Sequence, residues 1–126
     1  MPDDRWATVV HPTASLPQGS SLGPGTLLLA GVVITTPLRI GAHVVAMPNV
    51  LITHDDKIGD GVTFAGAASL GGGVTVEECA YIGQGASVRE MICIGTGAVV
   101  GMGSVVLQDV PAGEVWAGVP AKRIRG

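Results

Sequence analysis

The stretch "IGDGVTFAGAASLGGGVTVEECAYIGQGASV", residues 58–88, repeats a unit of six residues. A large apolar residue opens each unit, and a small or apolar residue usually stands two positions before it. Counting in steps of six from Val10 to Val106 meets 17 positions, and every one of them is apolar. A period of six fits neither the 3.6-residue turn of a helix nor simple strand alternation. It fits short strands joined by corners, with both apolar positions of each unit pointing inward.

A longer repeat, three units in length, supports this interpretation. The pairs Leu22-Gly23, Ile40-Gly41, Ile58-Gly59 and Ile94-Gly95 are separated by whole multiples of three units. If each unit forms one side, three units close one coil. This predicts an all-β fold, a single-stranded parallel β-helix of hexapeptide repeats with about five coils. We expect the frequent glycine after the large residue to bend the chain at positive φ. Within one domain, residues 1–126, we predict a lead-in at 1–7, coils at 8–107 and a cap and tail at 108–126.

Composition and charge narrow the classes of function. The chain is 47% apolar but only 3% aromatic, and its net charge is -3. This charge gives no general attraction to nucleic acid, and no apolar run approaches the roughly 20 residues of a membrane span. The acidic start, MPDDRW, lacks the layout of a signal peptide. Because Cys79 and Cys93 form neither a disulfide framework nor a metal-binding pair, we expect reduced thiols in a cytoplasmic protein.

The run "NVLITHDDKIGDG", residues 49–61, places an imidazole and two carboxylates side by side. His54 follows the inward Ile52 by two positions, so we expect its side chain to point outward at a corner. Gly72 occupies the same position three units later, which is one coil further on, inside a triple glycine. Successive coils stack at about 4.8 Å. His54 is therefore predicted to face a bare stretch of backbone at Gly72.

Such a pair suits acyl transfer. Imidazole is the natural general base near neutral pH, and a fixed N–H can stabilise the oxyanion that forms from a thioester carbonyl. Asp55 can orient the imidazole and stabilise its charged form. An outward histidine can also be a plain surface residue, and a triple glycine can be only a tight corner. Asp56 falls on an inward position, where a charge is costly unless paired. Either Asp56 bonds to the backbone, or the coil is locally distorted.

Two further features concern charge and metals. Lys122, Arg123 and Arg125 stand in the last five positions, where they form either a solubilising terminus or a clamp for phosphate groups. Coenzyme A carries such groups and would fit a groove between adjacent β-helices. The chain has three histidines, as a gamma-type carbonic anhydrase uses for zinc. Because His11, His43 and His54 are well separated in sequence, with no second histidine near His54, we expect no metal site.

Several segments together resemble the sialic-acid O-acetyltransferase NeuD family of the hexapeptide-repeat acyltransferase superfamily. They are "ITHDDKIGDG", "AGAASLGGGVTV", "YIGQGASV", "IGTGAVVGMGSVVLQDVPAG" and "AGVPAKRI". The family includes bacterial nucleotide-amino-sugar N-acetyltransferases, and the similarity runs from about Ala7 to the end of the chain. It implies left-handed β-helices that assemble as homotrimers, with active sites between neighbouring subunits. It also implies acetyl-CoA as the acyl donor.

The resemblance also assigns roles to individual residues. It implies that His54 is the base, that Asp55 is its partner and that the Gly72 backbone binds the acetyl carbonyl. It places coenzyme contacts near Gln84 and Met102. The proline-alanine-lysine motif of the family tail corresponds to residues 120–122, so Lys122 and the following Arg123 are expected to hold coenzyme phosphates.

The sequence thus predicts an acetyl-CoA-dependent acyltransferase that acts on an amine or hydroxyl of a sugar or nucleotide-sugar. Family members carry an N-terminal Rossmann-like domain of roughly 80 residues that holds the acceptor, and this sequence begins where that domain would end. We expect no nucleic-acid or membrane partner. The alternatives are a non-catalytic β-helix trimer that acts as a scaffold or binding module, and a gamma-carbonic-anhydrase-like metal hydratase. The sequence names neither the acceptor nor the atom that is acetylated.

Overall fold

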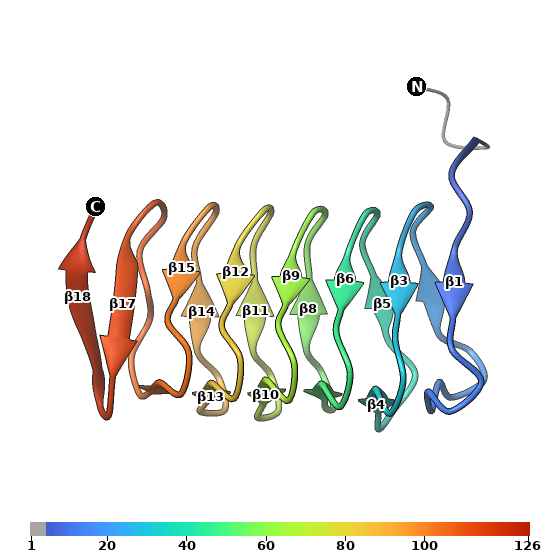
Figure 1. Cartoon of the computed structure of the whole chain (residues 1–126), viewed down its shortest axis with the longest axis horizontal. Helices are drawn as coiled ribbons and strands as arrows, with labels where there is room; N and C mark the ends of the chain where they lie inside the picture. Colours follow the sequence, from blue (N-terminus) through green and yellow to red (C-terminus); the bar gives the residue numbers. More distant parts are fainter. Residues whose placement is uncertain (1–4) are drawn as a thin grey trace.

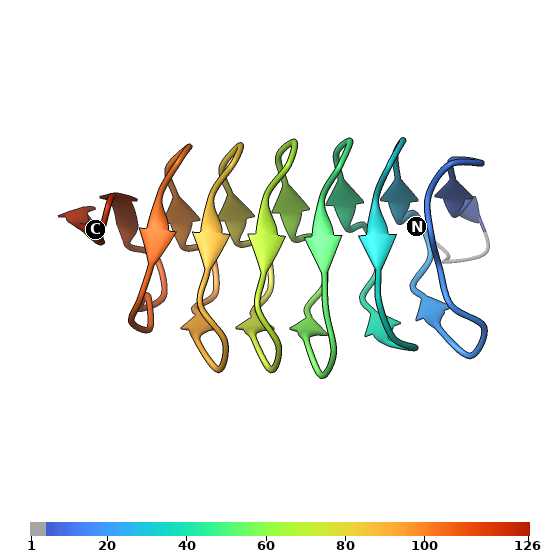
Figure 2. The same cartoon turned by 90° about the horizontal axis from the view of Figure 1, so that it is seen from below.

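The computed structural model describes residues 5–126, which form a parallel β-helix with three flat sides (Figure 1). One side, sheet A, contains β1 (Val9–Val10), β3 (Leu27–Leu28), β6 (Val45–Ala46), β9 (Thr63–Phe64), β12 (Tyr81–Ile82), β15 (Val99–Val100), β17 (Val115–Gly118) and β18 (Ala121–Arg125). Sheet B, which faces the viewer in Figure 2, contains β4 (Val33–Ile34), β7 (Leu51–Ile52), β10 (Ser69–Leu70), β13 (Ser87–Val88) and β16 (Val105–Val106). Sheet C contains β2 (Ser21–Leu22), β5 (Arg39–Ile40), β8 (Lys57–Ile58), β11 (Thr75–Val76) and β14 (Cys93–Ile94).

The register between coils is the predicted one of three units. Val9 pairs with Leu27, and Tyr81 pairs with Val99, in parallel. The sheet A strands from β1 to β17 run down the near side in Figure 1 and sheet C strands run up the far side, while the coils advance from right to left. This path is left-handed, which confirms the expectation and departs from the right-handed rule for ordinary parallel crossovers. No helix in residues 5–126 is long and apolar enough to cross a membrane.

The inward positions form one continuous core. Of the 17 large positions in phase, the 14 from Leu28 to Val106 are buried. The first three, Val10, Leu16 and Leu22, are only partly covered, and Val10 is 38% exposed. They lie in the first coil, where no preceding coil packs against them. The inward prediction therefore holds wherever a coil has neighbours on both sides.

The structural reason for glycine directly after the large inward residues differs from the predicted one. Gly59 and Gly71 are not at positive φ; that conformation occurs two residues further on, at Gly61 and Gly73. A Cβ on Gly59 would lie 2.9 Å from the backbone nitrogen of Glu78, and one on Gly71 would meet the Glu90 backbone at 2.7 Å. Glycine is needed there because the next coil approaches too closely for a side chain.

The coil count is about six, not the predicted five. Sheet A has six strands before the closing hairpin of β17 and β18, which pair antiparallel. The last coil is shortened, because Val99 pairs with Val115 and Ile94 bridges to Val110, both two positions short of three full units. This shortening hides the coil from a count in sixes. Part of the predicted cap at 108–126 therefore completes a coil, and most of the lead-in, residues 1–4, lies outside the described residues.

Candidate active site

The edge between sheets B and C carries the predicted catalytic residues. His54 lies in the turn between β7 and β8, and Gly72 lies in the turn between β10 and β11, one coil further along. The two turns are joined by a hydrogen bond in which the Gly73 N–H donates to the His54 carbonyl oxygen at 2.9 Å. We call this edge the BC corner.

The His54 ring lies directly over the Gly72 backbone, as predicted. A Cβ built on Gly72 would lie within 2.8 Å of three ring atoms, Nδ1, Cε1 and Nε2. The Gly72 carbonyl accepts the Met91 N–H at 2.9 Å, but the Gly72 N–H has no hydrogen-bond partner among residues 5–126. An imidazole and an unpaired backbone donor therefore lie on neighbouring turns of the same corner. The predicted bare shelf is narrower than expected, because Met91 Sδ covers Gly73.

Asp55 stands beside the imidazole, on the solvent side. Its Oδ2 lies 3.2 Å from His54 Nδ1, and the side chains of Asp55 and His54 are 86% and 67% exposed. Asp55 adopts φ 61°, a left-handed conformation in which Asp is tolerated better than most residues. Exposed ion pairs contribute little to folding stability. The contact is placed where it can orient the ring without adding to stability.

Asp56 points into the β-helix, as predicted, and it bonds to the backbone. Its Oδ2 accepts the Thr53 N–H at 2.8 Å, and its Oδ1 accepts the Val74 N–H of the next coil at 2.9 Å. Only 3% of the residue is exposed. Burial raises the pKa of the Asp56 carboxyl, and the hydrogen bonds from Thr53 and Val74 oppose part of this rise. Of the two expectations for Asp56, the backbone bonds are correct.

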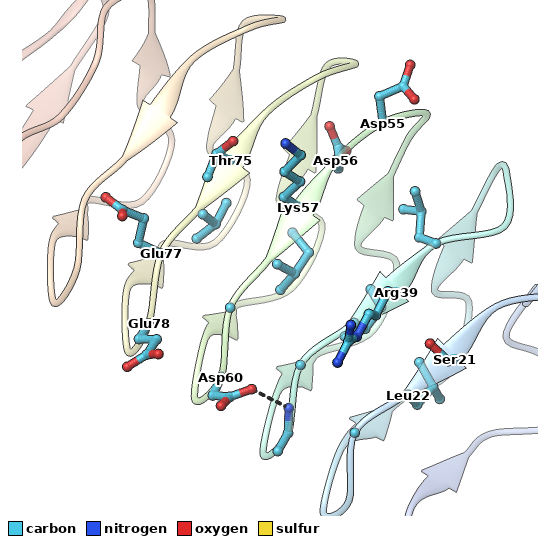
Figure 3. A pocket seen from close by; sticks show the side chains of 18 of the residues that line it. Ser21, Leu22, Arg39, Asp55, Asp56, Lys57, Asp60, Thr75, Glu77 and Glu78 are labelled. Atoms are coloured by element: carbon cyan, nitrogen blue, oxygen red, sulfur yellow. Dashed lines mark hydrogen bonds between the residues drawn. The ribbon is translucent and has the colours of Figure 1, made fainter.

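The BC corner opens onto a hollow of about 580 Å³ beside His54. Asp55, Lys57, Thr75 and Met91 contribute side chains to this hollow. A groove of about 1150 Å³ along the outer face of sheet C shares Asp55, Lys57 and Thr75 with it. Figure 3 shows Lys57 near the end that carries Asp55 and Asp56. Lys57, Thr75 and Met91 were not predicted from the sequence, although the register between coils places Met91 next to Gly73.

The predicted coenzyme residues lie elsewhere on the same chain. Gln84 and Met102 are exposed in turns between sheets A and B, a different edge from that of His54. Lys122 and Arg123 lie on β18, at the C-terminal end of sheet A. Arg123 is engaged locally, because it donates to the Gly126 carbonyl oxygen at 3.0 Å and lies 4.0 Å from Glu114 Oε1. A single chain therefore does not bring these residues to His54.

The three histidines, which were weighed as metal ligands, are also far apart. His11, His43 and His54 occupy three different corners, and no group of three His, Cys, Asp or Glu residues in the described part of the chain is placed to hold a metal. Five outward apolar residues of the strands are divided between two sheets. Val33, Leu51 and Val105 lie on sheet B, whereas Val45 and Val99 lie on sheet A.

The fold and the BC corner define a left-handed hexapeptide β-helix in which an imidazole, its carboxylate partner and a backbone N–H that is unpaired within the described chain lie on one edge. No family model matches the chain, and no curated protein does so. Solved structures do match. PerB from Caulobacter crescentus, solved with CoA and GDP-perosamine, is 35% identical over 94% of this chain and 57% of its own, with a TM-score of 0.91.

Two further structures extend the comparison. A histidine-to-alanine variant of GDP-perosamine N-acetyltransferase from C. crescentus, with the same two ligands, is 30% identical over 96% of this chain and 58% of its own, with a TM-score of 0.82. The acetyltransferase domain of PglB from Neisseria gonorrhoeae, solved with acetyl coenzyme A, is 30% identical over 92% and 57%, with a TM-score of 0.84. The chain thus spans a little over half the length of these structures, and its structural neighbours include sugar N-acetyltransferases.

Proposed function

We propose that this chain is an acetyl-CoA-dependent acyltransferase of the NeuD type, which acetylates a sugar or nucleotide-sugar. The observation that carries the proposal is the His54 ring lying over Gly72, whose N–H has no partner among residues 5–126. The structural neighbours that were solved with CoA or acetyl coenzyme A support the choice of donor. Their names support an amine rather than a hydroxyl as the acceptor group.

The chemistry follows from the two groups at the BC corner. His54 removes a proton from the acceptor amine as its nitrogen attacks the thioester carbonyl carbon. The carbonyl oxygen becomes an oxyanion, and the Gly72 N–H donates a hydrogen bond to it. When the tetrahedral intermediate collapses, the carbon–sulfur bond breaks and the imidazolium returns its proton to the coenzyme thiolate. A general base typically contributes about 10²–10⁴-fold and an oxyanion donor about 10²–10³-fold.

Asp55 acts through His54 in this scheme. Its carboxylate lies 3.2 Å from Nδ1, so it favours the tautomer in which Nδ1 carries the hydrogen and Nε2 is free to accept the acceptor's proton. The negative charge also stabilises the imidazolium formed during attack. Because both side chains are solvent-exposed in the single chain, a neighbouring subunit or the substrates must exclude water for this charge to act strongly.

The dispersed coenzyme residues support a site shared between two copies of the chain. Gln84 and Met102 lie on the edge between sheets A and B, while His54 lies on the BC corner. In a homotrimer of three-sided β-helices, one edge of each subunit can face a different edge of its neighbour. Acetyl-CoA would then contact His54 from one subunit and Gln84, Met102, Lys122 and Arg123 from the next. Exposed Val33 and the partly exposed apolar residues of sheets A and B provide surface for such assembly.

The test is coenzyme A release from acetyl-CoA with amino sugars, nucleotide-linked amino sugars and sugar alcohols as acceptors. His54→Ala should leave the oligomer intact and lower turnover at least about 100-fold, while His43→Ala, an exposed histidine at another corner, should keep full activity. Full activity in His54→Ala would refute the mechanism. Failure to bind any coenzyme A would favour a scaffold, and stoichiometric zinc in the purified protein would favour a metal hydratase.

A further inference from the structure

Asp56 is the one carboxylate in the described chain that is buried inside the β-helix. Its two oxygens accept hydrogen bonds from two different turns of the BC corner. One donor is the Thr53 N–H, which directly precedes His54, and the other is the Val74 N–H, which follows Gly72 by two positions. Asp56 therefore connects the turn that carries the imidazole to the turn that carries the free N–H.

At other inward positions the same contact between coils is made without a charge, whereas the carboxylates of Asp60 and Asp109 make such contacts from exposed positions. Ser20 accepts the Leu38 N–H at 3.2 Å, and Thr26 accepts the Val44 N–H at 3.2 Å, in each case from the equivalent position of the next coil. A neutral hydroxyl is thus sufficient to satisfy the donor of the next coil. Asp56 does more, because a second oxygen also holds its own turn at Thr53.

The carboxylate is a costly choice at this position. Burial destabilises a charged group, and even satisfied buried charges often contribute little to net stability. A hydroxyl would give the same coil-to-coil contact with a smaller desolvation penalty. The carboxylate stands at the one corner that carries His54, which indicates that its role concerns the geometry of that corner.

We propose that Asp56 is a positioning residue of the acyl-transfer site, whose two hydrogen bonds fix the His54 turn against the Gly72 turn. This inference rests on the proposed function. The register it holds is the one that seats the imidazole over Gly72. Loss of either bond lets the two turns slide or tilt relative to one another, and the base then separates from the oxyanion donor. Misplacement of reacting groups by about 1 Å can lower a rate by about 100-fold.

Two substitutions test this role with a matched control. Asp56→Asn has nearly the same shape but only one acceptor oxygen, so either Thr53 or Val74 faces an NH₂ group. Asp56→Ser imitates Ser20 and keeps only the bond to the next coil, which protects folding. Thr26→Val is the control, because it removes the equivalent neutral clamp at a place remote from the BC corner.

We expect both Asp56 variants to lower kcat by about 10- to 100-fold while the KM for acetyl-CoA changes by less than about threefold. Thr26→Val should lose similar thermal stability but keep kcat within about twofold. Full kcat in either Asp56 variant would overturn the proposal. An equal loss of kcat in Thr26→Val would also overturn it, since the effect would then be general loosening of the coils.

Amide hydrogen exchange provides a readout that needs no turnover. The Thr53 and Val74 N–H groups both have Asp56 as their partner, so exchange of at least one of them should accelerate at least about tenfold in Asp56→Asn. Exchange of both groups should remain unchanged in Thr26→Val. Unchanged exchange at both Thr53 and Val74 in Asp56→Asn would refute the clamp itself. If the wild-type chain transfers no acetyl group to any acceptor, the proposed function fails separately, and the exchange data still decide whether Asp56 joins the two turns.

Discussion

Replacement of Gly72 by alanine is the most direct probe of the geometry at the BC corner. The added methyl group would lie within 2.8 Å of three atoms of the His54 ring. Carbon atoms in contact are normally about 3.5–4 Å apart, so the ring must move by about 1 Å or more. Gly72 is not at positive φ, and the His54 side chain is 67% exposed. The ring can therefore swing into solvent, and the backbone is not strained.

The expected result is a large loss of activity with little loss of stability. A displacement of about 1 Å corresponds to about a 100-fold fall in kcat, or about 2.7 kcal/mol of transition-state stabilisation. The free energy of unfolding should change by less than about 1 kcal/mol, because glycine-to-alanine changes without strain are neutral or slightly stabilising. Coenzyme A release and urea unfolding of the same preparation measure both quantities.

Gly66→Ala is the matched control. Gly66 occupies the corresponding turn position between sheets A and B, and the nearest atom to its added Cβ would be the Pro48 carbonyl oxygen at 3.6 Å, an ordinary contact. This variant should keep both activity and stability. If Gly72→Ala retains wild-type kcat, the position of the His54 ring over Gly72 is not part of the mechanism. If it unfolds, the assumption of a mobile ring is wrong.

Three other outcomes are expected. Because burial raises the pKa of Asp56, its contribution to stability is fully present below the unfolded value of 3.8 and is lost as pH rises through the folded pKa. The melting temperature of wild type relative to Asp56→Asn should therefore fall as pH increases from acid. A constant difference in melting temperature would contradict this. Phe64→Ala removes a fully buried ring and should lower the free energy of unfolding by about 3–5 kcal/mol in urea titration, whereas a loss below about 1 kcal/mol would mean that the core collapses around it. Lys122→Ala should raise the KM for acetyl-CoA severalfold at low salt with kcat unchanged, and an unchanged KM would remove Lys122 from the coenzyme site.

The periodicity of the sequence determined most of the fold, for a local reason. Each side of the prism is one repeat unit, and each unit meets its equivalent one coil later, so a linear count predicts which residues become neighbours. His54 could be placed over Gly72 in this way, and Asp56 could be placed inside. The same count missed the final coil, because a coil that is two positions short leaves the phase while Val110 and Val115 still pair with the coil before it.

The details that matter for chemistry depended on tertiary structure. Only the stacked coils show that Gly59 and Gly71 avoid a clash with the next backbone and do not provide positive φ. Asp56 obtains its second hydrogen bond from the Val74 N–H, which lies in the next coil. The three-sided path separates His54 from Gln84 and Lys122, although all lie in one short chain. A period of six records whether a residue faces in or out, and the position of its unit within the coil of three decides which edge it occupies.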